Sequence, residues 1–267
     1  MNELPSGYDF TELYEKRVRN SADLSVILSD RSNRRGTGKT VFALLLADAM
    51  DRTEAGLTKQ KVAISVDEVL DAYMNCPKGS GIVLDEAEQS LSKYRAGSSA
   101  NMAMRELISM GRVREKFIVF SLPSSSSLDR DLKALCSWWF LVQEKGSAWS
   151  HALNYNPYAE EPRTPRKDDR WFWDDIPEDH RLRDVYDYLH EEKLKHLNGE
   201  TDESSQRLTS AEVQDKIDKI KSETQTNTRN QLLTQIYSNS GLTQQQLANA
   251  VNLSRSRIAD IINQDSL

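Results

Sequence analysis

The chain has 267 residues, of which 38% are hydrophobic and 28% charged. This length suits one α/β domain with a small second unit, and this composition excludes collagen-like and wholly disordered chains. The formal net charge of −6 excludes a protein that coats nucleic acid by bulk electrostatics, so any contact with DNA must be local.

The sequence gives no sign of a membrane or secreted protein. No apolar run approaches the roughly 20 residues that span a bilayer, and the acidic N-terminal stretch does not fit a signal peptide. The two cysteines, Cys76 and Cys136, are too few for a disulfide scaffold and lack zinc-ligand spacing. We therefore expect a cytoplasmic protein with two buried thiols and no membrane contact.

Short β-rich runs alternate with longer helical patterns over residues 24–155. Unbroken apolar strands indicate burial on both faces, as in a parallel sheet with crossover helices. The predicted strands are 24–29, 62–66, 82–84, 117–121 and 138–142, and the predicted helices are 40–50, 67–74, 101–113 and 128–135. The fold class expected is therefore α/β.

The chain after the fifth strand predicts a change of structure. The turn residues 144–147 predict a hairpin that adds an antiparallel strand over 148–155. We expect an ATPase-sized domain over 1–180, with its core at about 20–157 and an irregular wrapping segment at 158–180 anchored by the aromatic run 171–173. A helix at about 182–197 and a flexible linker then occupy 181–208, and a helical domain occupies 209–267.

A glycine-rich loop follows the first strand and opens the first helix. Its sequence, Asp30-Arg-Ser-Asn-Arg-Arg-Gly-Thr-Gly-Lys-Thr40, matches the G-x-x-x-x-G-K-[ST] phosphate-binding pattern except that Asn33 replaces the first glycine. Asn reaches left-handed backbone angles more readily than other non-glycine residues, so the loop can still close. The residues predicted to bind nucleotide are Asn33, Arg34, Arg35, Gly36, Thr37, Gly38, Lys39 and Thr40.

The chemistry of this loop predicts ATP and Mg²⁺ as cofactors. Backbone N–H groups at a helix N-terminus form an anion-binding nest, and the dipole of the helix adds to it. The Lys39 ammonium would bridge the β- and γ-phosphates as a catalytic group, and the Thr40 hydroxyl would be a ligand of Mg²⁺.

The second motif is a pair of acidic residues, Asp85 and Glu86, which directly follows a predicted buried strand. Ligands of α/β sheets lie outside the carboxyl ends of the strands, so the Asp85 carboxylate can reach the metal held by Thr40. Glu86 would then orient or deprotonate the attacking water, which is the role of a catalytic base. A solvated acidic turn is the alternative.

Together the two motifs resemble those of the additional-strand, RecA-like class of P-loop ATPases. In that class a further strand lies between the loop strand and the acidic strand, and 117–121 is the expected occupant. Ser121 ends this strand where the class carries a polar γ-phosphate sensor. The resemblance implies a RecA-like P-loop sheet and an Mg-dependent ATPase.

Within this class the chain looks similar to the HerA/FtsK family of DNA-pumping ATPases and its viral and plasmid relatives. The similar segments are Ile82-Val-Leu-Asp-Glu-Ala-Glu88, Met110-Gly-Arg-Val-Arg114 and Phe117-Ile-Val-Phe-Ser-Leu-Pro-Ser124. This sequence has Ser121-Leu122 where the family usually has Thr-Gln before the proline. The resemblance implies a homo-oligomer in which an arginine of a neighbouring subunit completes the site, with Arg105, Arg112 and Arg114 as candidates.

The segment 242–262 resembles a helix-turn-helix. Thr243 and Gln246 predict a capping box, Asn252 takes the left-handed turn position, and Ser254 is expected to cap the second helix. Ala248 is the small residue expected where the two helices cross, and the expected shared core consists of Leu247, Val251, Leu253, Ile258 and Ile261.

The start of the second helix is the candidate DNA surface. Side chains at this end of a recognition helix enter the major groove, and serine and arginine hydrogen-bond bases and phosphates. The predicted DNA-binding residues are Ser254, Arg255, Ser256 and Arg257. Because the charge of residues 229–267 is only about +1, one copy should bind weakly and an oligomer should gain avidity.

These features predict an ATPase that acts on DNA in replication, packaging, transfer or segregation of a genome. One alternative is a transcription regulator in which ATP switches the oligomeric state. A second alternative keeps the ATPase but makes the C-terminal module a docking site for protein.

Overall fold

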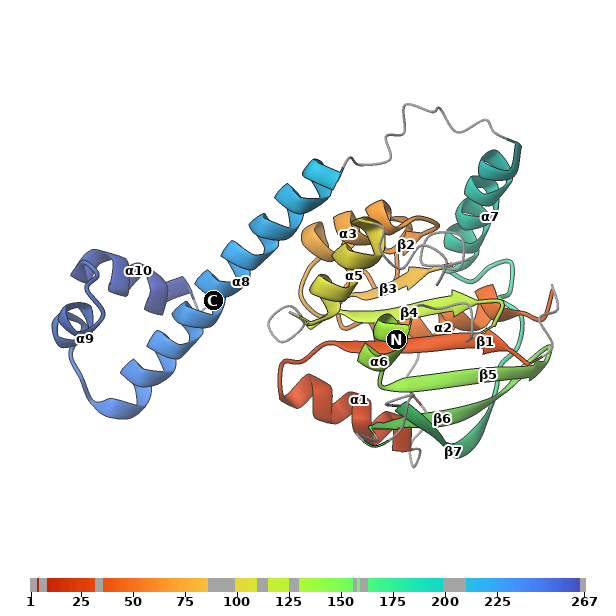
Figure 1. Cartoon of the computed structure of the whole chain (residues 1–267), viewed down its shortest axis with the longest axis horizontal. Coiled ribbons are helices and arrows are strands. Elements are labelled where there is room, and N and C mark those ends of the chain that lie inside the picture. The colour runs from red at the N-terminus through yellow and green to blue at the C-terminus, as the bar shows by residue number, and fades with distance from the viewer. Residues whose placement is uncertain are drawn as a thin grey trace. The chain divides into compact units, whose positions relative to one another are not determined.

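The structure is a computed structural model, and it describes residues 4, 9–31, 36–85, 99–109, 115–124, 130–155, 158, 163–198 and 210–264. The chain divides into two compact units, Met1–Ile217 and Asp218–Leu267 (Figure 1). Each unit has its own buried core, so each is described by itself.

A seven-stranded sheet in the order β2-β3-β4-β1-β5-β6-β7 forms the centre of the first unit (Figure 1). Strands β1 to β5 are parallel, and β6 and β7 continue the sheet antiparallel. The strands are β1 (Leu24–Asp30), β2 (Val62–Ala63), β3 (Gly81–Leu84), β4 (Phe117–Leu122), β5 (Trp138–Glu144), β6 (Ser147–Tyr155) and β7 (Arg163–Phe172). The parallel sheet, the β5–β6 hairpin and the position of β4 between β1 and β3 confirm the predicted α/β topology.

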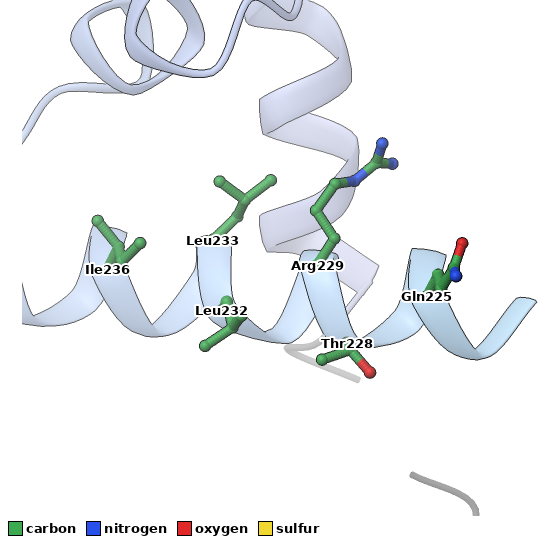
Figure 2. Close-up of a pocket in the computed structure, with 6 residues that line it drawn as sticks. All are labelled: Gln225, Thr228, Arg229, Leu232, Leu233 and Ile236. Carbon is green, nitrogen blue, oxygen red and sulfur yellow. The ribbon is translucent and has the colours of Figure 1, made fainter. Parts of the chain in front are cut away.

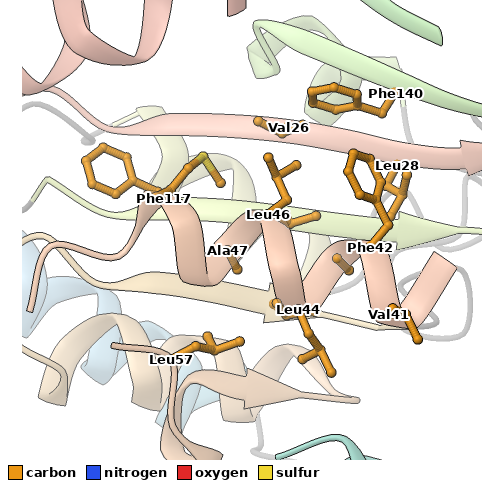
Figure 3. Packing of buried hydrophobic residues seen from close by; sticks show 14 of the residues in the cluster. Val26, Leu28, Val41, Phe42, Leu44, Leu46, Ala47, Leu57, Phe117 and Phe140 are labelled. Carbon is orange, nitrogen blue, oxygen red and sulfur yellow. The ribbon is translucent and has the colours of Figure 1, made fainter. Parts of the chain in front are cut away.

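Helix α2 (Lys39–Met50) packs against the centre of the sheet, where it meets β3 and β4. In Figure 3 its Phe42 and Leu46 side chains lie close to Val26 and Leu28 of β1. Eight residues of this helix are buried, which explains why its sequence is apolar on nearly all sides.

The remaining helices of this unit agree largely with the predicted ranges. They are α3 (Val66–Asn75), α5 (Ser99–Ser109), α6 (Arg130–Leu135) and α7 (Arg183–Asn198), with a short 3₁₀ helix η1 (Lys59–Lys61). The predicted strand 62–66 is shorter than expected because the Ser65 hydroxyl accepts a hydrogen bond from the Glu68 N–H and so begins α3.

Helix α1 (Asp9–Arg19) was not predicted from the sequence. Its Phe10 is fully buried, and the ring packs against Trp138, Phe140 and Trp171 at centroid distances of 5.1–5.6 Å. One aromatic residue therefore joins this helix to the antiparallel part of the sheet.

Strand β7 corrects the prediction that residues 158–180 are irregular. Residues 163–172 pair with β6. Of the aromatic run expected to anchor this segment, Trp171 and Trp173 pack on the core, whereas Phe172 is 70% exposed. This edge strand carries Pro165 and six charged residues, and charges and proline are common devices that keep an edge from pairing further. The same residues hide the alternation of apolar and polar positions by which a strand is predicted.

Both cysteines are free thiols. Cys136 is buried as predicted, whereas Cys76 is partly exposed. No helix of the described residues is both long and apolar enough to span a bilayer.

The second unit is a helix-turn-helix preceded by a long helix. It contains α9 (Gln244–Ala250), α10 (Arg255–Gln264) and most of α8 (Ser210–Ser240). The predicted capping box of Thr243 and Gln246 is present, and Asn252 has a φ of 54°. The small core contains Leu233, Leu247, Ala248, Ile258 and Ile261, with Leu253 packed against it.

Two residues of this unit differ from the prediction. Val251 was expected in the shared core but is 37% exposed at the end of α9. Leu233 of α8 is buried in this core instead, because the preceding helix supplies the third wall of the bundle.

Candidate nucleotide-binding site and helix-turn-helix surface

The second half of the glycine-rich loop leads directly into helix α2. Gly36 and Gly38 have φ values of 72° and 79°, a left-handed conformation that glycine adopts without a steric penalty. Gly38 is the N-cap residue of α2, and its carbonyl accepts the first helical hydrogen bond from the Phe42 N–H at 3.0 Å. The first N–H groups of α2 have no intrahelical acceptor, which is the arrangement that binds an anion.

The Lys39 side chain folds back over this loop. Its Nζ donates a hydrogen bond to Thr37 Oγ1 at 3.3 Å. Asn33, Arg34 and Arg35 lie outside the described residues, so their roles as nucleotide-binding residues stay predictions.

The structure brings together the two residues that were predicted to bind metal. Thr40 Oγ1 donates a hydrogen bond of 2.6 Å to Asp85 Oδ2, across 45 positions of sequence. Thr40 lies in the first turn of α2, and Asp85 follows β3 directly. The Asp85 N–H donates to the Ala63 carbonyl at 2.9 Å, which fixes the backbone at the end of the strand.

Helix α2 and strand β3 lie unusually close together, which brings Thr40 within hydrogen-bond distance of Asp85. A Cβ atom on Gly81 would lie 2.1 Å from the Ala47 carbonyl oxygen, so only glycine fits at the start of β3. Asp51, which follows α2, also accepts a hydrogen bond from the Gly81 N–H at 2.9 Å. Helix and strand are therefore held together near one end, with Thr40 and Asp85 meeting farther along.

Asp85 is buried among hydrogen-bond donors. Burial alone raises the pKa of this carboxyl group, but the Lys193 ammonium and the side-chain hydrogen bonds from Lys193, Ser121 and Thr40 outweigh it, so the pKa is lowered. Ser121, near the end of β4, was predicted to be the polar γ-phosphate sensor, and its side chain is hydrogen-bonded to the same carboxylate. Asp85 is ionised at neutral pH and can act as a hard anionic ligand.

Sequence reasoning missed Lys193. The Nζ atom of this α7 residue lies 2.6 Å from Asp85 Oδ2 and 3.3 Å from Thr40 Oγ1. The sequence did indicate that Lys193 faces inward, because it continues the helical spacing of the buried residues Leu182, Val185 and Leu189.

Trp173 is a second residue beside the loop that was assigned only a packing role. Its ring stacks on Phe42 of α2 with a centroid distance of 4.4 Å and an interplanar angle of 18°. A Cβ atom on Gly38 would be 3.4 Å from Trp173 Nε1 and 3.7 Å from Lys145 Cγ. The side chains of Trp173, which follows β7, and Lys145, which follows β5, therefore lie against the loop where it enters α2.

Thr40 and Asp85 fit a Mg²⁺ ion that is completed by nucleotide phosphates. Mg²⁺ prefers oxygen ligands and is usually held by one or two carboxylates together with phosphate oxygens and water. No cluster of three or more His, Cys, Asp or Glu residues suited to a metal occurs among the described residues, so a purely protein-built site is not seen there.

Other predicted catalytic residues are only partly placed. The proposed base Glu86 and the candidate arginines Arg112 and Arg114 lie outside the described residues. Arg105 forms an ion pair with Asp131 at 2.8 Å, which engages its guanidinium within the same chain.

The four predicted DNA-binding residues lie together at the start of α10. Ser254, Arg255, Ser256 and Arg257 are all exposed. Ser254 Oγ accepts a hydrogen bond from the Arg257 N–H at 3.2 Å and lies 3.0 Å from Ser256 Oγ. Ser254 is therefore the N-cap of this helix, and both arginines project from its first turn.

Helix α8 has an apolar strip on its surface, defined by Leu232 and Ile236, which are 52% and 44% exposed. Figure 2 shows the residues along a hollow of about 520 Å³ on this helix, namely Gln225, Thr228, Arg229, Leu232, Leu233 and Ile236. Positions 225, 229, 232 and 236 follow the spacing of a coiled-coil seam.

Comparison with known proteins adds to the assignment of the second unit. Residues 225–264 match a family model described as winged helix-turn-helix DNA-binding. A solved structure, the N-terminal domain of zonular occludens toxin from Neisseria meningitidis, resembles the chain with a TM-score of 0.37 and 15% identity, covering 62% of this chain and 98% of that one. No curated protein matches the chain significantly in sequence.

Proposed function

We propose that the chain is a Mg-dependent ATPase that acts on DNA, with the nucleotide bound by the first unit and DNA by the helix-turn-helix. The observation that carries this proposal is the 2.6 Å hydrogen bond between Thr40 and Asp85, next to a left-handed Gly38 that caps α2. A chance Gly-Lys-Thr sequence has no reason to meet a buried carboxylate at the end of a neighbouring strand.

Each residue of the site has a specific role in this proposal. Backbone N–H groups from Gly36 to Thr40 bind the phosphates, and Lys39 adds a positive charge at the β- and γ-phosphates. Thr40 and Asp85 would hold Mg²⁺, and the ion would supply positive charge that stabilises the charge developing on the phosphates. Glu86 accepts a proton from the attacking water, and Ser121 keeps the Asp85 carboxylate oriented.

The first test is turnover. Lys39→Ala should abolish release of phosphate from ATP, whereas Lys59→Ala, an exposed lysine of η1, should keep the wild-type rate. Glu86→Gln should bind ATP and fail to hydrolyse it. Normal turnover in Glu86→Gln would remove Glu86 from the catalytic role.

The second part of the proposal is binding of DNA through Ser254, Arg255, Ser256 and Arg257. The match of residues 225–264 to a DNA-binding family model and the exposure of both arginines support it. A double variant Arg255→Ala/Arg257→Ala should lose retention of duplex DNA, because each arginine supplies a contact to a base or a phosphate. Retention at the wild-type level would favour a protein-docking module instead.

We further propose that the protein is a homo-oligomeric motor for a viral, plasmid or cellular genome, as the resemblance to HerA/FtsK ATPases implies. A motor should hydrolyse ATP severalfold faster with any long duplex. An ATP-switched transcription regulator, the second candidate, should bind one short operator and turn over slowly, so the dependence of the rate on DNA length separates the two.

A further inference from the structure

Lys193 stands at a position of α7 where an apolar residue would be expected. The buried residues Leu182, Val185 and Leu189 lie on one face of this segment, and Lys193 follows at the next helical spacing. The neighbouring Leu194 is 46% exposed, so the helix directs a lysine inward and a leucine outward. This reversal places a positive charge against the nucleotide site.

The contacts of Lys193 are those of a fixed cation. Its Nζ lies 2.6 Å from Asp85 Oδ2, and the two side chains are 17% and 3% exposed. The same Nζ lies 3.3 Å from Thr40 Oγ1, which itself donates to that carboxylate oxygen. An ammonium group therefore binds the two side chains that the proposed function assigns to Mg²⁺.

The ammonium and Mg²⁺ cannot share these oxygens. Mg²⁺ requires near-octahedral oxygen ligands at 2.0–2.1 Å, as a general property of the ion. An ammonium at hydrogen-bond distance from the same Oδ2 occupies one of its lone pairs and repels the divalent ion, most strongly where water is largely excluded.

We propose that Lys193 is the resident counter-ion of the Asp85–Thr40 pair, and that Mg²⁺ enters with nucleotide only when Lys193 withdraws from Asp85. The inference rests on the proposed function of the site. Lys193 lies five residues before Asn198, where α7 ends and the chain continues toward the second unit. The Lys193–Asp85 ion pair holds this part of α7 against the site, so withdrawal of Lys193 removes a contact that stabilises the last turns of α7.

The test measures how much Mg²⁺ strengthens the binding of ADP, which contains phosphates for the loop and is not hydrolysed. Calorimetry is carried out with and without Mg²⁺ on wild type, Lys193→Met and Lys195→Met. Methionine is an unbranched side chain one atom shorter than lysine, and it removes the charge. Lys195 is a matched control because it is an exposed lysine of the same helix paired with Glu192.

In Lys193→Met, the gain in ADP affinity from Mg²⁺ should exceed the wild-type gain by about tenfold, because no ammonium competes for Asp85. Binding without Mg²⁺ should weaken, because a cation near the phosphates is lost. Lys195→Met should behave like wild type. An unchanged gain in Lys193→Met would overturn the inference, as would weaker Mg-ADP binding, which would make Lys193 a ligand of the phosphates.

Hydrogen exchange of residues 190–198 provides a readout that does not depend on affinity. Mg-ADP should accelerate exchange in the last turns of α7 in wild type, whereas Lys193→Met should exchange rapidly without any ligand. Lys193→Arg, which keeps the charge, should retain wild-type protection. Equal protection in wild type with and without Mg-ADP would contradict the inference.

Failure of the underlying function gives a different result. If none of the variants, wild type included, binds ADP, the nucleotide site itself is wrong. If all of them bind ADP with the same Mg²⁺ dependence, the site stands and only the role of Lys193 is wrong.

Discussion

Lys61 is a buried lysine whose ammonium group is satisfied by three partners. Its Nζ lies 2.7 Å from Asp51 Oδ2, Thr53 Oγ1 and the Gly56 carbonyl oxygen. Asp51 also binds the Gly81 N–H, so this ion pair joins the end of α2 to the start of β3. The pair fixes the two elements that carry Thr40 and Asp85.

Removing one member of this pair should therefore be costly. Lys61→Met leaves the Asp51 carboxylate buried without its counter-ion, and we expect a loss of about 3–5 kcal/mol in the free energy of unfolding. Denaturant unfolding measures this loss. The exposed Lys59→Met is the control and should change stability little, and a Lys61→Met variant as stable as wild type would show that the pair adds nothing.

His151 should make stability depend on pH. Its ring packs on Trp139 of β5 with a centroid distance of 5.1 Å. On the other side of β6, His151 pairs with Lys167 of β7, the strand that also carries Asp168. Burial, assisted by Lys167, lowers the pKa of His151 below its ordinary value of 6.5, although Asp168 and backbone hydrogen bonds oppose this. As pH falls through 6.5, the unfolded chain takes up this proton before the folded protein does, so folding is progressively disfavoured.

A His151→Phe variant tests this dependence, because phenylalanine keeps the ring and does not titrate. Between pH 7.5 and 5.5, wild type should lose more free energy of unfolding than His151→Phe does, whereas the two slopes should coincide above pH 7.5. Parallel slopes over the lower range would contradict the account.

At the residue scale, much of the candidate nucleotide site could be predicted from the sequence, but not all of it. Lys39, Thr40 and Asp85 were predicted because loop and strand-end motifs have fixed spacing. Lys193 was missed because one lysine in a charged helix carries no motif, and its importance depends on which face of α7 is buried. Helical spacing from Leu189 would have indicated that face.

At the scale of elements, Gly81 determines how closely α2 and β3 approach. A Cβ atom at this position would lie 2.1 Å from the Ala47 carbonyl oxygen and 2.9 Å from its carbonyl carbon, so backbone must move. Gly81→Ala should lower stability by about 1–3 kcal/mol, as overpacking typically does. It should also weaken Mg-nucleotide binding, because Thr40 and Asp85 move apart.

Thermal unfolding and calorimetry of Gly81→Ala measure both effects. A variant with the wild-type melting temperature and the wild-type affinity for Mg-ADP would show that the close approach does not matter for the site.

Elements were predictable where burial controls composition. β1, β3 and β4 were identified because both faces of each strand are covered, which demands apolar residues. β5 is fully buried on one face only, but its run of large apolar residues still marked it as a strand. β7 was missed because this exposed edge strand is rich in charged residues. α1 was missed because Phe10 is its one fully buried apolar residue. The aromatic residues that bury Phe10 lie more than 120 positions farther along the chain, so the local sequence of α1 does not reveal them.

At the scale of the whole molecule, the apolar strip on α8 is the surface that we expect to join copies of the chain. Leu232 and Ile236 are large and exposed, and the coiled-coil spacing of their helix face suits a second copy of the same helix. Leu232→Lys should lower the mass measured by light scattering. Gln231→Lys, on another face of α8, is the matched control and should leave it unchanged.

The melting curve of the Leu232→Lys variant must also match wild type, since Leu232 is outside the small core around Leu233. Unchanged mass in a folded Leu232→Lys protein would rule out this strip as the contact between subunits.

The proposed function depends on a triphosphate bound at the loop between β1 and α2. The most direct measurement is calorimetric titration of the full chain with a non-hydrolysable ATP analogue in the presence of Mg²⁺. We predict binding of one nucleotide per chain, and loss of that binding in Lys39→Ala. No binding of adenine or guanine nucleotides by the wild-type chain would contradict the account.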